Sequence, residues 1–403
     1  MATILYITYD GLMEPLGMSQ VWQYVKYLSK EHKIIILSFE KSDDLSKGDA
    51  LNLLKEEIDS YDVYWHPITY HKKPRFLATT YDILHAIFTS ALLIKKYNVE
   101  IIHSRSYIPS IIAFFMKFFL HIKYIFDMRG FWADEKIDSG VWKKKSIVYR
   151  VVKKIERHFF LNADVIVSLT NTGKRDIQSL NYMLNVDTEI SVIPTCTNLN
   201  IFKPRPKPNK NKIKIKKHGF ILGYVGSVET FYLFDEVLKS FLALLAIDSN
   251  AKLLVINRNQ HEYIKGRMFN IGVDMHSVEL KSSPYKKIPD EINRMDAGIF
   301  YIKPSFSKRS SSPTRMGEFL GCGKPCMSNF GVGDTESVLE GENVGIVLKS
   351  FSESEHMKGI NRLLELVKDK NIQERCTHVA KEHFSLGLGV EKYNNIYKQL
   401  VDK

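Results

Sequence analysis

The sequence predicts an α/β fold made of two domains, each with a parallel β-sheet covered by helices. Short apolar segments alternate along the chain with longer helical segments, which is the order of βαβ units. The apolar segments are continuous, as is typical of strands that are buried on both faces of a parallel sheet. The chain has 403 residues, too many for one ordinary core, and fits two domains of roughly 150–200 residues each.

The predicted strands of the first half are Ile4–Thr8, Ile34–Ser38, Ile101–His103, Tyr124–Asp127 and Val165–Leu169. The helical stretches between them are Gln20–Ser29, Tyr81–Lys96 and Lys143–Leu161. The predicted strands of the second half are Phe220–Val225, Leu253–Ile256, Ala297–Ile302, Pro325–Ser328 and Gly345–Leu348. Because parallel sheets bind ligands at the carboxyl ends of their strands, the loops that follow these strands are the candidate site.

A basic segment with three prolines and no acid, residues 203–217, separates the two halves and predicts a stiff, exposed linker. We expect an N-terminal domain at residues 1–202 and a C-terminal domain at residues 218–385, which face each other across a cleft. Residues 386–403 have a helical pattern, and we expect this helix to pack back on the N-terminal domain.

Composition favours a soluble globular protein, with 44% hydrophobic and 25% charged residues. The four cysteines have the spacing neither of a disulfide framework nor of a zinc site, which favours a reducing compartment. The N-terminus lacks the pattern of a secretion signal, and the longest apolar run noted, Tyr107–Leu120, is too short to span a bilayer. We therefore expect a cytoplasmic location.

The net charge of +12 is concentrated in residues 203–217 and in the basic helix expected at residues 143–158. Because the excess of positive charge is confined to these two segments, we expect local contacts with anions and no nucleic-acid partner. The apolar face of that helix is expected in the core. Its basic side is either solvated or in contact with acidic lipid headgroups at the inner face of the plasma membrane.

The most informative segment is S-S-P-T-R-M-G-E-F-L-G-C-G-K-P, at residues 311–325. We expect Ser312 to be an N-cap, with Pro313 at the first helical position and Thr314 next to it. The amides of this helix start, with Lys308 and Arg315 close by, predict a phosphate site. A carboxylate further along the helix, Glu318, is suited to bind hydroxyl groups.

Loops after other predicted strands add candidates. The first loop, Tyr9–Gln20, contains Gly17 and a possible helix cap, Ser19, and is either a ligand loop or an ordinary turn. The segment D-M-R-G-F-W-A-D-E, at residues 127–135, groups acids with an arginine and aromatics. There Arg129 is a candidate for a phosphate and Asp127 or Asp134 for a sugar hydroxyl, the alternative being a solvated loop with internal ion pairs.

At these residues the chain resembles the family 4 nucleotide-sugar glycosyltransferases, which have the GT-B fold. The matching segments are Y-D-G-L-M-E-P-L-G-M-S-Q at Tyr9, A-D-V-I-V-S-L-T at Ala163, V-I-P-T-C-T-N-L-N-I-F at Val192, G-Y-V-G-S at Gly223 and S-P-T-R-M-G-E-F-L-G-C-G-K-P at Ser312. The last is the most specific. The resemblance implies two facing Rossmann-like domains, a donor on the C-terminal one, an acceptor on the N-terminal one, and transfer with retention without a required metal or other cofactor.

In that family two glutamates flank the donor. Glu318 matches the second, which holds the ribose hydroxyls, whereas the first falls at Ser310. The turn after the first strand of the second domain also lacks the cations that the family often has there, so Arg258, Arg315 or Lys308 is expected to supply the phosphate charge. The catalytic candidates are Asp127, Arg129, Arg258 and Arg315. The donor-binding candidates are Gly17, Ser19, Gly226, Ser227, Arg258, Lys308, Ser312, Thr314, Arg315 and Glu318.

The sequence thus predicts a retaining glycosyltransferase that moves a sugar from a UDP- or GDP-linked donor to a glycan or lipid-linked acceptor, in bacterial surface polysaccharide or glycoconjugate synthesis. The developing charge on the leaving diphosphate calls for cations and helix amides, which the candidate residues provide. Two rival hypotheses are a GT-B-shaped nucleotide-sugar epimerase and a degenerate glycosyltransferase domain that acts as an assembly partner.

Overall fold

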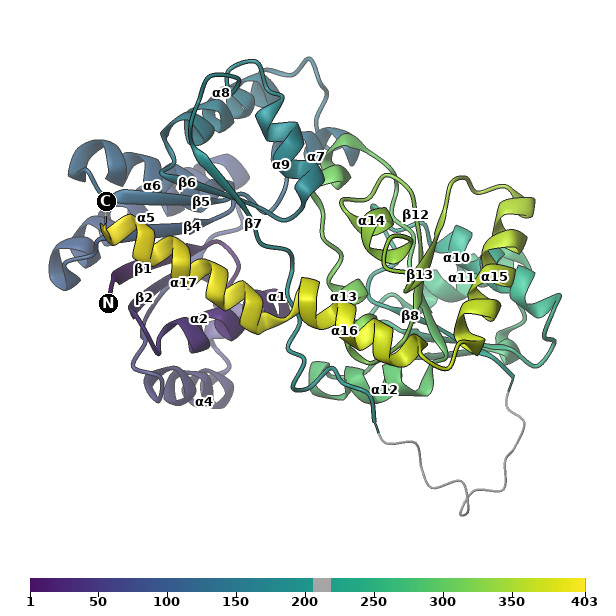
Figure 1. Ribbon diagram of the computed structural model, residues 1–403. Helices are drawn as coiled ribbons and strands as arrows, with labels where there is room; N and C mark the ends of the chain where they lie inside the picture. The colour runs from purple at the N-terminus through teal and green to yellow at the C-terminus, as the bar shows by residue number, and fades with distance from the viewer. Residues whose placement is uncertain (206–218, 403) are drawn as a thin grey trace. The chain divides into compact units, whose positions relative to one another are not determined.

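The computed structural model describes residues 1–205 and 219–402. Two compact units are distinguished in it. The first comprises Met1–Pro194 and the C-terminal helix α17 (Leu386–Asp402), and the second comprises Thr195–Ser385 (Figure 1). Most of the expected linker, residues 206–217, lies outside the described residues.

The first unit is built on a seven-stranded parallel sheet with the order β3-β2-β1-β4-β5-β6-β7. Its strands are β1 (Thr3–Thr8), β2 (Lys33–Lys41), β3 (Tyr64–Tyr70), β4 (Ile101–Arg105), β5 (Lys123–Asp127), β6 (Val165–Ser168) and β7 (Glu189–Val192). The direction in which strands are added reverses at β1, which lies between β2 and β4. Open α/β sheets bind ligands at such a switch point, beyond the carboxyl ends of the strands.

Helices cover both faces of this sheet. Besides α17 they are α1 (Pro15–Gly17), the π-helical turn η1 (Met18–Trp22), α2 (Gln23–Leu28), α3 (Ser42–Leu45), α4 (Gly48–Asp59), α5 (Arg75–Tyr97), α6 (Tyr107–Leu120), α7 (Trp132–Asp138), α8 (Ile147–Asn162) and α9 (Asn171–Gln178). Leu5 belongs to the core that includes buried residues of α5, α6 and α8. The next residue, Tyr6, points to the other face, where its ring and those of Tyr393 and Tyr397 on α17 meet at His103.

The second unit has a six-stranded parallel sheet with the order β10-β9-β8-β11-β12-β13. Its strands are β8 (Ile221–Val225), β9 (Lys252–Ile256), β10 (Val278–Lys281), β11 (Ala297–Ile299), β12 (Cys326–Asn329) and β13 (Gly345–Leu348). Its helices are α10 (Phe234–Leu245), α11 (His261–Ile271), α12 (Ile288–Arg294), α13 (Thr314–Gly321), α14 (Thr335–Leu339), α15 (Glu353–Lys368) and α16 (Ile372–Phe384), with 3-10 turns η2 (Met275–Ser277), η3 (Tyr285–Lys287) and η4 (Phe306–Ser310). The expected α/β class with two parallel sheets is confirmed.

The strands that the sequence pattern missed are β3, β7 and β10, and each lies at the edge of its sheet. An edge strand is not enclosed by neighbours on both sides, and these three carry half-buried or exposed residues between few buried ones. They therefore lack the continuous apolar run that identified the central strands.

The boundary between the units lies at Pro194, not at residue 202 as expected. Phe202 belongs to the core of the second unit, and the Thr197 amide donates a hydrogen bond to the carbonyl of Phe384 in that unit. These contacts attach residues 195–202 to the second unit. The C-terminal helix, in turn, is part of the first unit.

The expected basic helix begins later than residue 143. Ser146 is its N-cap and accepts a hydrogen bond from the Tyr149 amide, so Lys143–Lys145 precede α8. Val152 and the second half of α8 pack against the core, whereas Ile147, Val148 and Val151 in its first two turns are exposed. The expectation that the whole apolar face is buried is therefore wrong.

The longest apolar helix is α5, not Tyr107–Leu120. By length and composition alone, Leu77–Tyr97 is the one helical segment of residues 1–205 and 219–402 that meets the criteria for crossing a membrane. A third of its residues are buried inside the unit. The core helix of a soluble protein passes the same test, so the finding by itself does not assign a membrane span.

Candidate functional site

The first unit gathers charged side chains at the carboxyl ends of its central strands. In the sheet register, Thr8 of β1 lies beside Arg105 of β4, and Arg105 lies beside Asp127 of β5. The loop after β1 adds Asp10, which forms an ion pair with Arg105 at 3.5 Å. This is the switch point of the sheet, where the fold places ligands.

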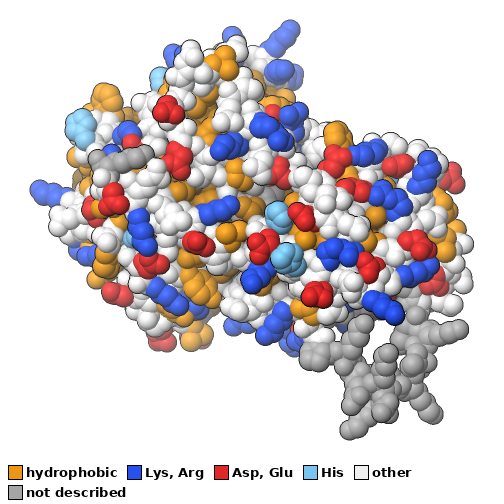
Figure 2. Space-filling view, viewed as in Figure 1, with side chains coloured by type: hydrophobic (Ala, Val, Ile, Leu, Met, Phe, Trp, Pro, Cys, Tyr) orange, Lys and Arg blue, Asp and Glu red, His pale blue; other side chains and the backbone are white. Residues whose placement is uncertain are grey.

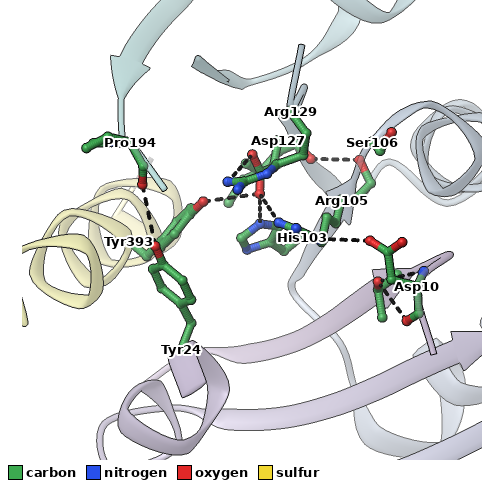
Figure 3. Close-up of polar contacts among 12 residues, drawn as sticks. Asp10, Tyr24, His103, Arg105, Ser106, Asp127, Arg129, Pro194 and Tyr393 are labelled. Carbon is green, nitrogen blue, oxygen red and sulfur yellow. Dashed lines mark hydrogen bonds and ion pairs between the residues drawn. The ribbon is translucent and has the colours of Figure 1, made fainter. Parts of the chain in front are cut away.

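Asp127 is the centre of this group (Figure 3). It is completely buried, and its Oδ2 accepts a hydrogen bond from the Tyr393 hydroxyl at 3.1 Å. Arg129 lies 3.7 Å from Oδ1, and Arg105 lies 3.8 Å from Oδ2. Burial by itself raises the pKa of Asp127, but Arg129, His103 and Arg105 outweigh burial and hold the pKa at about 2. The carboxylate is therefore ionised throughout the neutral range.

Because Asp127 has no exposed surface, it positions the two arginines and does not reach a substrate in this structure. Arg129 adopts a left-handed backbone conformation with φ 59°, which is uncommon for a residue with a side chain. Its side chain keeps 13% of its surface exposed. The predicted sugar contact of Asp127 is thus not supported, whereas Arg129 remains able to bind an anion.

Sequence reasoning missed His103 at this site. Its ring is fully buried, Nδ1 lies 2.6 Å from the Tyr397 hydroxyl, and Nε2 lies 3.6 Å from Asp127 Oδ2. Burial lowers the pKa of His103, which favours the neutral ring at pH 7. The signal was present, because the run H-S-R ends an otherwise apolar strand at the edge where ligands bind.

The first loop is held by a buried acid that the sequence pattern also missed. Glu40 accepts hydrogen bonds from the Leu12 amide at 2.6 Å and from the Met13 amide at 3.2 Å. Gly17 is buried, and a Cβ there would lie 2.0 Å from the Gly11 carbonyl oxygen, so this glycine serves close backbone packing. Ser19 lies inside the π-helical turn and does not cap a helix. For Gly17 and Ser19 the structure thus shows a packing role and a position inside a helical turn, and the predicted contact of each with the nucleotide-sugar donor stays a prediction.

In the second unit, α13 begins at Thr314, and its N-cap is Pro313, without a side-chain hydrogen bond. The Ser312 hydroxyl oxygen instead accepts a hydrogen bond from the Thr195 amide at 3.2 Å. The expected Ser312 cap is therefore wrong, because a competing backbone donor engages the side chain. Ser310 is completely buried, and its hydroxyl donates to the Ser307 carbonyl, so the first glutamate of the family has no counterpart here.

Arg315 lies in the first turn of α13 and faces the turn after β8. Its guanidinium carbon is 4.4 Å from the ring centre of Tyr232 and 5.1 Å from that of Tyr224. Its Nη2 would be 2.5 Å from a Cβ at Gly226, so only glycine leaves room for it. Within the described residues, Nη1 is buried and has no hydrogen-bond partner. A nearly buried cation with an unused donor is suited to bind phosphate.

Glu318 lies one turn further along α13. Burial raises its pKa to about 7, against the opposing charge of Arg315. Burial and the charge of Glu318 also raise the pKa of Tyr285, so this tyrosine is close to the carboxylate. No hydrogen bond to the Glu318 carboxylate is found in the part of the chain that the structure describes. The carboxylate is thus available for hydroxyl donors of a ligand.

The remaining candidates lie around the ends of β8 and β9. Gly226 has φ 113°, and its carbonyl accepts a hydrogen bond from the Asn257 side chain at 2.9 Å. Ser227 donates to the Gln260 side chain at 3.1 Å, and Arg258 is exposed. The lining of a nearby pocket of about 430 Å³ comprises Glu229, Arg258, Asn259, Gln260, His261, Glu262, Tyr263 and Ser282. The Lys308 ammonium lies 3.7 Å above the ring centre of Phe231.

The structure therefore brings together Gly226, Arg315 and, one turn away, Glu318, whereas Asp127 and Arg129 belong to the separate group in the first unit. Within residues 1–205 and 219–402, no group of three or more His, Cys, Asp or Glu side chains is arranged to hold a metal ion.

Comparison with known proteins gives one family match and several similar solved structures. Residues 19–201 match the family model of Glycosyltransferase Family 4. A glycosyltransferase from Rickettsia africae has 20% identity and a TM-score of 0.72, with 99% of this chain and 98% of that chain covered. Sucrose-phosphate synthase from Thermosynechococcus elongatus has 11% identity and a TM-score of 0.72, with 100% of both chains covered. No curated protein matches the chain.

A further similar structure is Anabaena Alr3699/HepE in complex with UDP-glucose, with 13% identity, a TM-score of 0.67, and 98% of this chain and 99% of that chain covered. The resemblance to the family 4 glycosyltransferases and the expected GT-B fold are confirmed. The family match covers residues 19–201, almost all of them in the first unit.

Proposed function

We propose that the protein is a retaining glycosyltransferase that transfers a sugar from a UDP- or GDP-linked donor to a glycan or lipid-linked acceptor. The observation that carries the proposal is the group formed by Gly226, Arg315 and Glu318 in the second unit. A buried cation with an unused donor lies one turn from a carboxylate that has no partner within the described residues. This combination suits a diphosphate and the ribose attached to it.

The proposed chemistry follows from charge. Cleavage of the bond between sugar and phosphate builds negative charge on the leaving diphosphate. Arg315 and the amides of the first turn of α13 stabilise this charge, because they are fixed in place before the reaction. The acceptor oxygen forms its bond to the anomeric carbon on the face from which the diphosphate leaves, and the leaving phosphate accepts the proton of the attacking hydroxyl. Attack on that face preserves the anomeric configuration without a covalent intermediate. We propose that no metal or other cofactor is required, because Arg315 supplies the cation.

UDP-sugars are the first donors to test, since the similar Anabaena protein was crystallised with UDP-glucose. We further propose that the protein works at the inner face of the plasma membrane in the synthesis of surface polysaccharides or glycoconjugates. The basic residues of the segment at 143–158 would contact acidic headgroups there.

The experiment is incubation of the protein with UDP- and GDP-sugars, with and without glycan and lipid-linked acceptors, in the presence and absence of EDTA. Nucleoside diphosphate that is released only with an acceptor, at a rate that EDTA leaves unchanged, is the expected result. Isomerised donor without acceptor would establish an epimerase instead. Turnover of no donor, with the fold intact, would favour the degenerate domain that the serine at position 310 permits.

A further inference from the structure

Helix α5 exposes a continuous row of large apolar side chains. Leu77, Tyr81, Leu84, Phe88 and Leu92 follow one another at intervals of three or four residues, so they lie on one side of the helix. Their exposed fractions lie between 54 and 67%. Single exposed apolar residues are ordinary, but a row along most of a 23-residue helix is not.

Helix α6 extends this surface. It packs against α5, and its last turns expose Phe115, Phe118, Phe119 and Leu120. The rings of Phe115 and Phe119 are stacked, with an angle of 7° between their planes. We call the nine exposed residues of the two helices the α5–α6 apolar face. Patches of this kind mark binding surfaces for membranes or proteins.

The α5–α6 apolar face lies on the surface of the first unit. Helix α5 itself is held in that unit by the residues on its other side. The other side of α5 is in the core, where Asp82, Ala86 and Ser90 are almost completely buried. Asp82 also accepts a hydrogen bond from the His71 amide at 2.9 Å. Removing α5 to span a bilayer would expose this side, so α5 is suited to lie at an interface and not to cross it.

Charge identifies the partner. Helices α5, α6 and α8 contain two acids, Asp82 and Glu156, and both are buried. The Phe114 ring of α6 lies 6.0 Å from the His158 ring of α8, so α8 continues the same layer. The exposed charged residues of the three helices, on the described side chains, are Lys95, Lys96, Arg150, Lys154 and Arg157. Figure 2 shows Lys and Arg side chains over the upper part of the first unit, where Figure 1 labels α8 and α9.

We propose that the α5–α6 apolar face docks the first unit onto an anionic phospholipid bilayer. Its aliphatic and aromatic side chains enter the headgroup region, while the cations at the C-terminal end of α5 and along α8 contact lipid phosphates. A second copy of the chain is a poorer partner, because symmetric pairing would bring these cations together. The proposal concerns binding alone and does not depend on the transferase activity.

The test is co-sedimentation of the full-length protein with vesicles of phosphatidylcholine alone or mixed with phosphatidylglycerol. The affinity of the double variant Leu84→Asp/Phe88→Asp for the mixed vesicles should be about tenfold lower or weaker still. The reason is that charges replace two apolar side chains that contact the bilayer. The matched control is Phe269→Asp, which changes a phenylalanine of α11 in the second unit that is 86% exposed. It should bind as the unchanged protein does.

Neutralising the cations with Lys95→Ser, Lys96→Ser and Lys154→Ser should weaken binding in low salt and leave less difference in high salt. Equal binding of the Leu84/Phe88 variant and the unchanged protein would overturn the proposal, as would equal binding to neutral and anionic vesicles. A protein that ignores vesicles but forms a dimer that the Leu84/Phe88 variant abolishes in sedimentation velocity would show that the face pairs two copies instead. Circular dichroism verifies that the variants are folded.

Discussion

Arg315 and Glu318 lie one helical turn apart on α13, and both are almost completely buried. Burial opposes the charge of each residue, and their opposite charges partly compensate. For Glu318 burial wins, so its pKa of about 7 leaves the carboxyl half ionised at neutral pH. A bound ribose, whose hydroxyls donate hydrogen bonds, favours the ionised form.

We therefore expect nucleotide affinity to depend on the ionisation of Glu318. The carboxyl is mostly protonated near pH 6 and mostly ionised near pH 8, so the affinity for UDP should rise by up to about tenfold over this range. The variant Glu318→Gln has no ionisable carboxyl at this position, so its affinity for UDP should rise less over the same pH range. The remaining rise then reflects the titration of UDP itself. Isothermal titration calorimetry at several pH values measures the difference. Identical pH profiles would remove Glu318 from the ribose site.

The pKa of Asp127 is shifted in the opposite direction from that of Glu318, because its cationic neighbours outweigh burial. The variant Asp127→Asn leaves Arg105 and Arg129 without their buried counter-charge and should reduce the free energy of unfolding by about 3–5 kcal/mol. Because the folded pKa of about 2 is below the ordinary value of 3.8, this contribution is present above pH 3.8 and is lost as the pH falls toward 2. The exposed partner Asp10 supplies the control, and Asp10→Asn should cost less than about 1 kcal/mol.

Urea unfolding at pH 7 and near pH 2.5 measures both variants. If Asp127→Asn were as stable as the unchanged protein, the carboxylate would not hold the cluster together.

At the scale of elements, the turn after β8 determines where Arg315 can lie. Gly226 combines a positive φ with a position against the guanidinium, so two separate constraints require glycine there. The turn is fixed further by Asn257, which follows β9 and bonds to the Gly226 carbonyl. The donor group therefore depends on two strand ends and one helix start.

The variant Gly226→Ala should displace Arg315 and lower the affinity for UDP by about tenfold, because the added Cβ occupies the position of Nη2 and strains the turn. Gly266→Ala is the matched control, since Gly266 lies on α11 with open space around its Cβ position. The control should bind UDP normally. An unchanged affinity in Gly226→Ala would mean that Arg315 does not contact the nucleotide.

At the scale of the whole molecule, the first unit is formed from both ends of the chain. Its last helix, α17, follows the entire second unit in sequence but packs against β4 and α2. Buried side chains of α17 such as Ile396 and Tyr397 complete the face of the sheet that carries His103. The first unit is therefore complete only when α17 has been made.

Ile396→Ala should lower the stability of the first unit by about 2–4 kcal/mol, because it leaves a cavity beneath α17. Tryptophan fluorescence isolates this unit, since all four tryptophans, Trp22, Trp65, Trp132 and Trp142, lie within it. Val401→Ala, on an exposed position of the same helix, is the control and should change the unfolding midpoint little. Equal midpoints for the two variants would show that α17 does not stabilise this unit.

The two parallel sheets could be predicted from the sequence, because central strands bury both faces and so require continuous apolar runs. The sequence also placed Arg315 and Glu318 on one helix, since their spacing is local. Tertiary structure alone decided which of the other candidates matter. Ser312 bonds to the distant Thr195 amide instead of capping α13, His103 and Asp127 meet only across strands, and the exposed row of α5 is recognised only when the other side of the helix is seen in the core. Local patterns fix periodicity and spacing, whereas burial and partners depend on residues that are far apart in the chain.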